Sequence, residues 1–143
     1  MKILILCTGN SCRSQMGQAF MQSYNTNIEV YSAGTKPSSI VHPLAINVMS
    51  ELGFDLNNYK PESVNLYLKT DFDYLITVCG GAKESCPNFT GNVKHRIHIG
   101  FDDPAEAKGD DAFVLSEFRR IRDEINKDFK QYYLKTITSD GQK

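Results

Sequence analysis

Residues 2–17 read KILILC, TGNSCRS and QMG in succession, and this stretch decides the fold. Its apolar run ends on Cys7, and a short apolar run followed by turn-forming residues is typical of a buried strand. The loop TGNSCRS (8–14) leads into a segment with apolar residues at helical spacing. The stretch therefore predicts a strand, a tight loop and the first turn of a helix.

This loop has the composition of an oxyanion-binding site with a nucleophile at its base. Backbone N–H groups above a helix N-terminus attract anions, and Gly9 and Asn10 tolerate the left-handed backbone that such a loop needs. The planar guanidinium of Arg13 can hold two oxygens of a tetrahedral oxyanion. The same positive field is expected to lower the pKa of Cys7 and to favour its nucleophilic thiolate. A buried structural cysteine beside a surface arginine is the disfavoured alternative.

The predicted substrate-binding residues are the loop itself: Thr8, Gly9, Asn10, Ser11, Cys12, Arg13 and Ser14. We expect Ser14 to hydrogen-bond the Cys7 thiolate from the start of the helix. Asn10 and Ser11 are expected to stabilise the loop, and Cys12 is expected to point into the core.

The composition is that of a globular protein with one domain. Its 143 residues are 41% hydrophobic and 23% charged, with a formal net charge of -1, so no nucleic-acid or membrane partner is indicated. No apolar run approaches the ~20 residues of a transmembrane helix or resembles a signal peptide. We therefore expect a cytoplasmic monomer. The four cysteines fit no zinc spacing, which leaves inert core thiols or redox chemistry.

Periodicity predicts an α/β chain. The expected strands are 2–7, 28–33, 72–78 and 94–99, and the expected helices are 13–24, 42–52 and 112–133. A strand, a helix and a strand within the first part of the chain make a βαβ unit, which has parallel strands. The predicted fold is a three-layer α/β/α arrangement with a four-stranded, mostly parallel open sheet. Residues 1–135 are expected to form one catalytic domain and residues 136–143 a flexible tail.

Hydrophobic spacing also predicts which helix faces are buried. The residues expected to face inward are Leu44, Ile46, Val48, Met49 and Leu52 in one helix, and Phe113, Leu115, Phe118, Ile121, Ile125 and Phe129 in the other. Residues 80–85 contain two glycines and no apolar anchor, so this segment is expected to be mobile. The histidines His42, His95 and His98 lack ligand spacing and are interpreted as surface or packing residues.

Chemically reactive residues follow several of the expected strands. Cys7 and Cys79 each end a strand, and Asp103 follows the fourth strand. Ligands of open parallel sheets bind beyond the carboxyl ends of the strands. These side chains can therefore converge on one edge of the sheet.

The sequence resembles the thioredoxin-coupled arsenate reductases, which share a fold with the low-molecular-weight protein tyrosine phosphatases. The resemblance spans residues 2 to about 129 and rests on CTGNSCRSQM (7–16), YSAG (31–34) and GFDDP (100–104). The loop and the Asp-Pro pair are common to both families. Cys79 and the Cys86-Pro87 pair distinguish the reductases.

The resemblance implies a relay of three cysteines that reduces As(V) to As(III). Cys7 attacks arsenate, Arg13 holds its oxygens, and Asp103 acts as general acid. Cys79 then attacks the Cys7 sulfur, which releases arsenite and forms a disulfide. Cys86 next attacks Cys79 and carries the disulfide outward to thioredoxin, the external reductant. No tightly bound cofactor is expected.

Some relatives bind potassium near the loop, and the resemblance places a weak potassium site at Asn10, Ser32 and Glu62. Gln18 stands where an acid is usual, so the site lacks one formal negative charge. This argues against potassium dependence, and no other metal is expected.

The predicted function is therefore an arsenate reductase regenerated by thioredoxin, for which phosphate or sulfate would mimic arsenate. The first alternative is a low-molecular-weight protein tyrosine phosphatase that hydrolyses phosphomonoesters through a cysteinyl-phosphate intermediate. Such phosphatases usually place an aromatic residue after the Asp-Pro pair, where this chain has Ala105-Glu106. The second alternative is a non-enzymatic oxyanion or redox sensor.

Overall fold

The computed structural model of the protein describes residues 1–138, and its centre is a parallel sheet with strand order β2-β1-β3-β4. The strands are β1 (Lys2–Cys7), β2 (Glu29–Gly34), β3 (Phe72–Thr77) and β4 (Val93–His98). The apolar run of residues 3–6 is completely buried, because β1 is paired on both edges. All pairings between these strands are parallel, where the sequence predicted a mostly parallel sheet.

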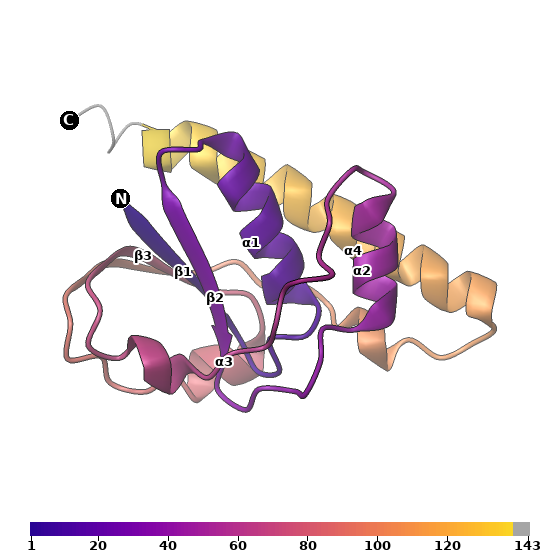
Figure 1. Cartoon of the computed structure of the whole chain (residues 1–143), viewed down its shortest axis with the longest axis horizontal. Helices are drawn as coiled ribbons and strands as arrows, with labels where there is room; N and C mark the ends of the chain where they lie inside the picture. The colour runs from indigo at the N-terminus through magenta and orange to yellow at the C-terminus, as the bar shows by residue number, and fades with distance from the viewer. Residues whose placement is uncertain (139–143) are drawn as a thin grey trace.

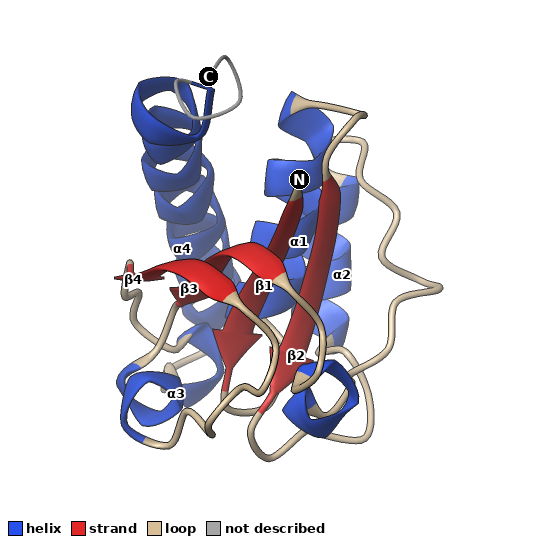
Figure 2. Cartoon of the chain, turned by 90° about the vertical axis from the view of Figure 1, so that its left-hand side faces the viewer, coloured by secondary structure: helices blue, strands red, loops and turns tan. Residues whose placement is uncertain are grey.

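Three longer helices cover one face of the sheet (Figure 1 and Figure 2). They are α1 (Arg13–Tyr24), α2 (Pro43–Ser50) and α4 (Asp111–Tyr132). Helix α1 has the predicted bounds and packs on β1, β2 and α4, while α2 packs on α4. None of the helices in residues 1–138 has the length and apolarity needed to cross a membrane.

Shorter elements lie on the other side of the sheet. They are the 3-10 turn η1 (Val64–Tyr67) and the short helix α3 (Gly80–Glu84), whereas a second 3-10 turn, η2 (Pro104–Glu106), packs against α4. The connections from β1 to β2 and from β3 to β4 step across the sheet in opposite directions. Right-handed crossovers therefore put α1 and α3 on opposite faces.

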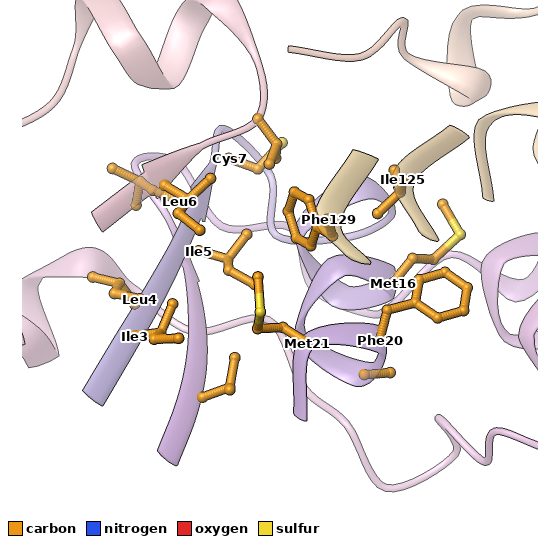
Figure 3. Packing of buried hydrophobic residues seen from close by; sticks show 14 of the residues in the cluster. Ile3, Leu4, Ile5, Leu6, Cys7, Met16, Phe20, Met21, Ile125 and Phe129 are labelled. Carbon is orange, nitrogen blue, oxygen red and sulfur yellow. The ribbon is translucent and has the colours of Figure 1, made fainter. Parts of the chain in front are cut away.

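The core forms where α1 and α4 meet the central strand. Figure 3 shows Ile5 of β1 directed toward Phe129, whereas Leu4 and Leu6 point to the other side of the strand. Gly17 permits this packing, because a Cβ there would lie 2.7 Å from a ring carbon of Phe129.

The structure corrects several expectations about packing. Leu52 is 45% exposed because α2 ends at Ser50, and Phe113, in the first turn of α4, is 48% exposed. Residues 80–84, which were expected to be mobile, form α3, and its anchor is the fully buried side chain of Ala82.

The end of the chain is also more ordered than predicted. A π-helical turn, Tyr133–Ile137, follows α4, and the side chain of Ile137 is buried. The packed chain therefore continues past residue 135. Residues 139–143 of the expected tail lie outside the described residues.

Candidate active site

The loop after β1 is shaped by the segment that follows β2. Carbonyl oxygens of residues 8, 9 and 11 accept hydrogen bonds from the N–H groups of residues 36, 38 and 42 at 2.9, 2.8 and 3.0 Å. Asn10 has a φ of 51°, the left-handed conformation that this residue type tolerates. In the described part of the chain, the N–H groups of residues 9–12 donate no hydrogen bond. With their carbonyl groups bound by the neighbouring segment, these N–H groups are left for an anion.

A cavity of about 250 Å³ lies over this loop. The predicted residues in its lining are Cys7, Gly9, Ser11, Cys12, Arg13 and Asp103, and the remaining lining residues are Ser38, His42 and Ala105. The sequence did not indicate the last three as site residues. Ser38 and His42 reach the cavity only because residues 35–42 fold back over the loop, so no local pattern marks them.

Other predicted loop residues do not line the cavity. Ser14 was expected to bond the Cys7 thiolate, but its Oγ accepts a hydrogen bond from Nδ2 of Asn10 at 2.8 Å. Both side chains are fully buried, and Asn10 also donates to Oγ of Ser32 at 3.0 Å. The left-handed turn directs the Asn10 side chain beneath the loop, where Ser14 is its partner. The Thr8 hydroxyl instead contacts Sγ of Cys79 at 3.3 Å.

Arg13 connects the loop to the turn that carries the predicted general acid. One of its terminal nitrogens donates to the carbonyl of Phe101 at 3.0 Å, and the other lies 3.4 Å from a carboxylate oxygen of Asp103. The second carboxylate oxygen of Asp103 accepts from the N–H of Ala105 at 3.0 Å. The guanidinium and the carboxylate are therefore fixed at the same cavity.

The thiols of Cys7 and Cys79 are neighbours at the base of the site, and each shifts the pKa of the other. The neighbouring Cys79 and burial raise the pKa of Cys7, which is the opposite of the shift expected from the sequence. The neighbouring Cys7 lowers the pKa of Cys79 to about 4, assisted by the hydrogen bonds of Thr8 and of the Ala82 N–H and by the charge of Arg13. Cys79 caps the N-terminus of α3, so it has more donors and carries the negative charge of the pair.

Comparison with known proteins agrees with this geometry. A family model, that of the low molecular weight phosphotyrosine protein phosphatases, matches residues 2–143. The chain belongs to this family.

Within the low molecular weight phosphatase family, the chain is similar to proteins named arsenate reductase. That of Halalkalibacterium halodurans is 42% identical over 131 residues, which cover 91% of this chain and 93% of the relative. A solved arsenate reductase in the phosphate binding state is 27% identical with a TM-score of 0.74, covering 94% of this chain and 97% of that chain. A thioredoxin-dependent arsenate reductase of Corynebacterium glutamicum is 28% identical with a TM-score of 0.62, covering 93% and 62%. The predicted fold class and the resemblance to arsenate reductases are thereby confirmed.

In this member of the phosphatase family, Cys86 lies apart from the paired thiols. It follows the C-terminal end of α3, while Cys79 caps the other end. Its Sγ donates to the carbonyl of Pro87 at 3.6 Å and faces a separate cavity of about 240 Å³, shared with Arg96 and His98. Burial raises the pKa of this thiol, although Arg96 opposes the shift. The structure therefore brings Cys7 and Cys79 together but does not bring Cys86 to them.

The residues implied for a potassium site are bonded to one another. The Nδ2 group of Asn10 donates a hydrogen bond to Oγ of Ser32 at 3.0 Å. Its Oδ1 accepts a hydrogen bond from the backbone N–H of Glu62 at 2.9 Å. Ser32 donates to Oε1 of Gln18 at 2.6 Å, and the Glu62 carboxylate accepts from the Tyr67 hydroxyl. These side chains hydrogen-bond within the protein, and the weak potassium site stays a prediction. Within residues 1–138, no group of at least three His, Cys, Asp or Glu side chains could hold a metal ion.

Proposed function

We propose that this protein is an arsenate reductase that converts arsenate to arsenite through Cys7, Cys79 and Cys86 and is regenerated by thioredoxin. The observation that carries the proposal is that Cys7, at the base of an oxyanion cavity, has Cys79 as its neighbour, so that each thiol shifts the pKa of the other. Phosphoester hydrolysis needs one cysteine, whereas reduction needs two electrons, and two thiols supply them by forming a disulfide.

In the first step the loop N–H groups and Arg13 bind the arsenate oxygens, and Cys7 attacks arsenic. The Cys7 proton passes to the neighbouring Cys79, whose pKa is lowered while that of Cys7 is raised. Asp103 donates a proton to the oxygen that leaves as water. A covalent Cys7–arsenic adduct results, with arsenic still As(V).

In the second step Cys79 attacks the sulfur of Cys7. The Cys7–arsenic bond breaks, its electron pair stays on arsenic, and the thiol proton leaves with arsenite. The two sulfurs are oxidised to a disulfide, and As(V) becomes As(III). The existing contact between the thiols supports this step, because a disulfide needs its Cα atoms within about 7 Å.

The third step transfers the disulfide to Cys86, and it requires α3 to unwind. Cys79 and Cys86 flank the helix, and seven positions (79 to 86) at about 1.5 Å each would separate them by about 10 Å. A helix of 5 residues is marginal without tertiary contacts. Unwinding lets Cys86 reach Cys79 and presents the new disulfide to thioredoxin.

The test is arsenite production from arsenate with thioredoxin, thioredoxin reductase and NADPH. We expect the parent to turn over, Cys86→Ser to stop after one arsenite per protein with a Cys7–Cys79 disulfide, and Cys79→Ser to make none. Cys12→Ser is the thiol control: Cys12 has no part in the relay, so this variant should continue past one arsenite per protein, whatever its place in the loop does to the rate. A parent that makes no arsenite but hydrolyses an aryl phosphate would overturn the proposal in favour of a phosphatase.

A further inference from the structure

His42, at the start of α2, belongs to the oxyanion cavity although the sequence marks it only as a surface or packing residue. It lines that cavity together with Cys7, Arg13 and Asp103. Its backbone N–H donates to the carbonyl of Ser11 at 3.0 Å. Its ring packs on Phe118 of α4, with centroids 4.8 Å apart. The imidazole is therefore held by the loop, by α2 and by α4 at once.

The contacts of the ring determine which nitrogen carries the proton. Nδ1 accepts a hydrogen bond from the backbone N–H of Leu44 at 3.1 Å, which caps α2. A proton on Nδ1 would set two N–H groups against each other, so the ring is neutral and protonated at Nε2. Burial also lowers the pKa of His42, against the raising effect of Asp103. Within the described residues, Nε2 has no hydrogen-bond partner in the protein.

We propose that the Nε2–H group of His42 donates a hydrogen bond to the oxyanion bound over Cys7, which makes His42 a substrate-binding residue. The inference rests on the proposed function, because it assigns a further donor to the same anion. Helix capping alone does not account for a histidine, since Ser, Thr, Asn and Asp are the preferred caps. The imidazole caps the helix with one nitrogen and keeps the other for the cavity.

A neutral donor here complements the charged groups of the cavity. Arg13 and Asp103 are the charged side chains in the lining, and Cys7 and Cys12 are its thiols. Arg13 also forms an ion pair with Asp103 at 3.4 Å. Its guanidinium therefore interacts with both the Asp103 carboxylate and the bound oxyanion. An Nε2–H donor binds an oxyanion oxygen without competing for that carboxylate, and it fixes the orientation of the anion relative to α2.

The first test follows histidine nitrogen resonances of the reduced protein while inorganic phosphate is added. We expect His42 to show the neutral Nε2–H form and its Nε2 signal to move with the same Kd as the amide signals of residues 9–12. His95 and His98 are internal references, because both belong to β4 and neither lines the oxyanion cavity. A His42 signal that stays still while the loop amides move would overturn the inference.

The second test is His42→Ser, which keeps a preferred capping group and removes the donor. We expect phosphate to bind about tenfold more weakly, the loss typical of one hydrogen bond to a charged group. Equal affinity in the variant and the parent would refute the proposed role. If the variant unfolds more easily than the parent, the phosphate titration of the parent protein, followed by its histidine nitrogen signals, decides whether His42 binds the anion.

These measurements separate the inference from the proposed function. A protein whose loop amides and His42 both respond to phosphate but which makes no arsenite keeps the inference and loses the reductase proposal. If the protein makes arsenite but its His42 signal does not move when phosphate is added, the reductase proposal stands and the inference about His42 is wrong. If neither the loop nor His42 responds, no oxyanion binds at this site, and both are wrong.

Discussion

At the residue scale, the two thiols at the base of the site differ only in their surroundings. Both are buried, but Cys79 has the Thr8 hydroxyl and the Ala82 N–H against its sulfur at 3.3 and 3.4 Å, so its pKa is lowered, whereas burial and the neighbouring Cys79 raise the pKa of Cys7. The resting thiolate is therefore on Cys79, and the nucleophile becomes reactive when its proton moves to its neighbour. This coupling keeps Cys7 protonated until substrate enters the cavity.

We predict that the reduced protein has one thiolate at pH 6, seen by its ultraviolet absorbance. Because the pKa of Cys79 is lowered from 9.0 to about 4, the signal should appear as pH rises through about 4. It should vanish in Cys79→Ser and remain in Cys12→Ser. Cys7→Ser should move the transition to higher pH, because the neighbouring Cys7 thiol is the largest cause of the lowered pKa of Cys79. A signal kept by Cys79→Ser but lost by Cys7→Ser would instead locate the thiolate on Cys7.

A second prediction concerns the general acid. Asp103→Asn removes the proton donor and should slow the single-turnover formation of arsenite by roughly 10²–10⁴-fold, the usual contribution of general acid catalysis. Phosphate affinity should not fall, because Arg13 is released from its 3.4 Å ion pair and remains available to the anion. Calorimetric titration with phosphate measures the affinity. Weaker binding together with an unchanged rate would rule out the acid role.

At the element scale, α3 must satisfy two demands. As a helix it presents the Ala82 N–H to the sulfur of Cys79 at 3.4 Å, which supports the thiolate. As the segment between two redox cysteines it must also unwind. Gly80 and Gly81 weaken the helix, and the buried side chain of Ala82 holds it in place.

We predict that Gly80→Ala slows disulfide transfer to Cys86. A Cβ at this position would meet nothing within 4 Å, so the substitution stabilises the helix by about 0.5–1 kcal/mol and slows unwinding up to about fivefold. Steady-state arsenite production should fall, whereas single-turnover production in a Cys86→Ser background should not change. Gly81→Ala is an unsuitable control, because its Cβ would lie 2.7 Å from the Thr8 hydroxyl. Equal slowing of both rates would exclude a specific effect on the transfer.

At the scale of the whole molecule, α4 holds α2 in place through a buried arginine. Arg122 is only 7% exposed, and it donates to the carbonyl of Val48 at 2.9 Å and to Glu51 at 2.8 Å. Both acceptors lie at the end of α2 opposite His42. The position of the imidazole in the cavity therefore depends on the contact between α2 and α4.

We predict that Arg122→Ala lowers the free energy of unfolding by about 1.5–3 kcal/mol, the range for hydrogen bonds to a charged group. Urea unfolding measures the loss, and phosphate binding should weaken as well, because α2 is held less firmly. Arg119→Ala is the matched control: it bonds Glu51 too, but its side chain is 46% exposed, so its effect should be much smaller. Similar losses in the two variants would contradict a special role for Arg122.

Local patterns in the sequence were sufficient for much of the fold. The run of residues 2–7 predicts β1, the bounds of α1 are as predicted, and the expected βαβ unit is present. The approach of Cys7 and Cys79 follows from the rule that parallel strands present their carboxyl ends at one edge. These predictions succeed because they depend on backbone propensity, hydrophobic periodicity and the handedness of crossovers, all of which are written in neighbouring residues.

The sequence by itself determined the strands, the oxyanion loop and the residues at the strand ends, whereas the tertiary structure alone decided how their side chains pair. The thiolate on Cys79, the turn of Ser14 toward Asn10 and the entry of His42 into the cavity each depend on side-chain contacts that no local pattern encodes. Part of the support for the Cys79 thiolate comes from Thr8, which is 71 positions away in the sequence. The physical reason is that hydrogen bonds and burial act over a few ångströms in space, wherever the chain has folded back on itself.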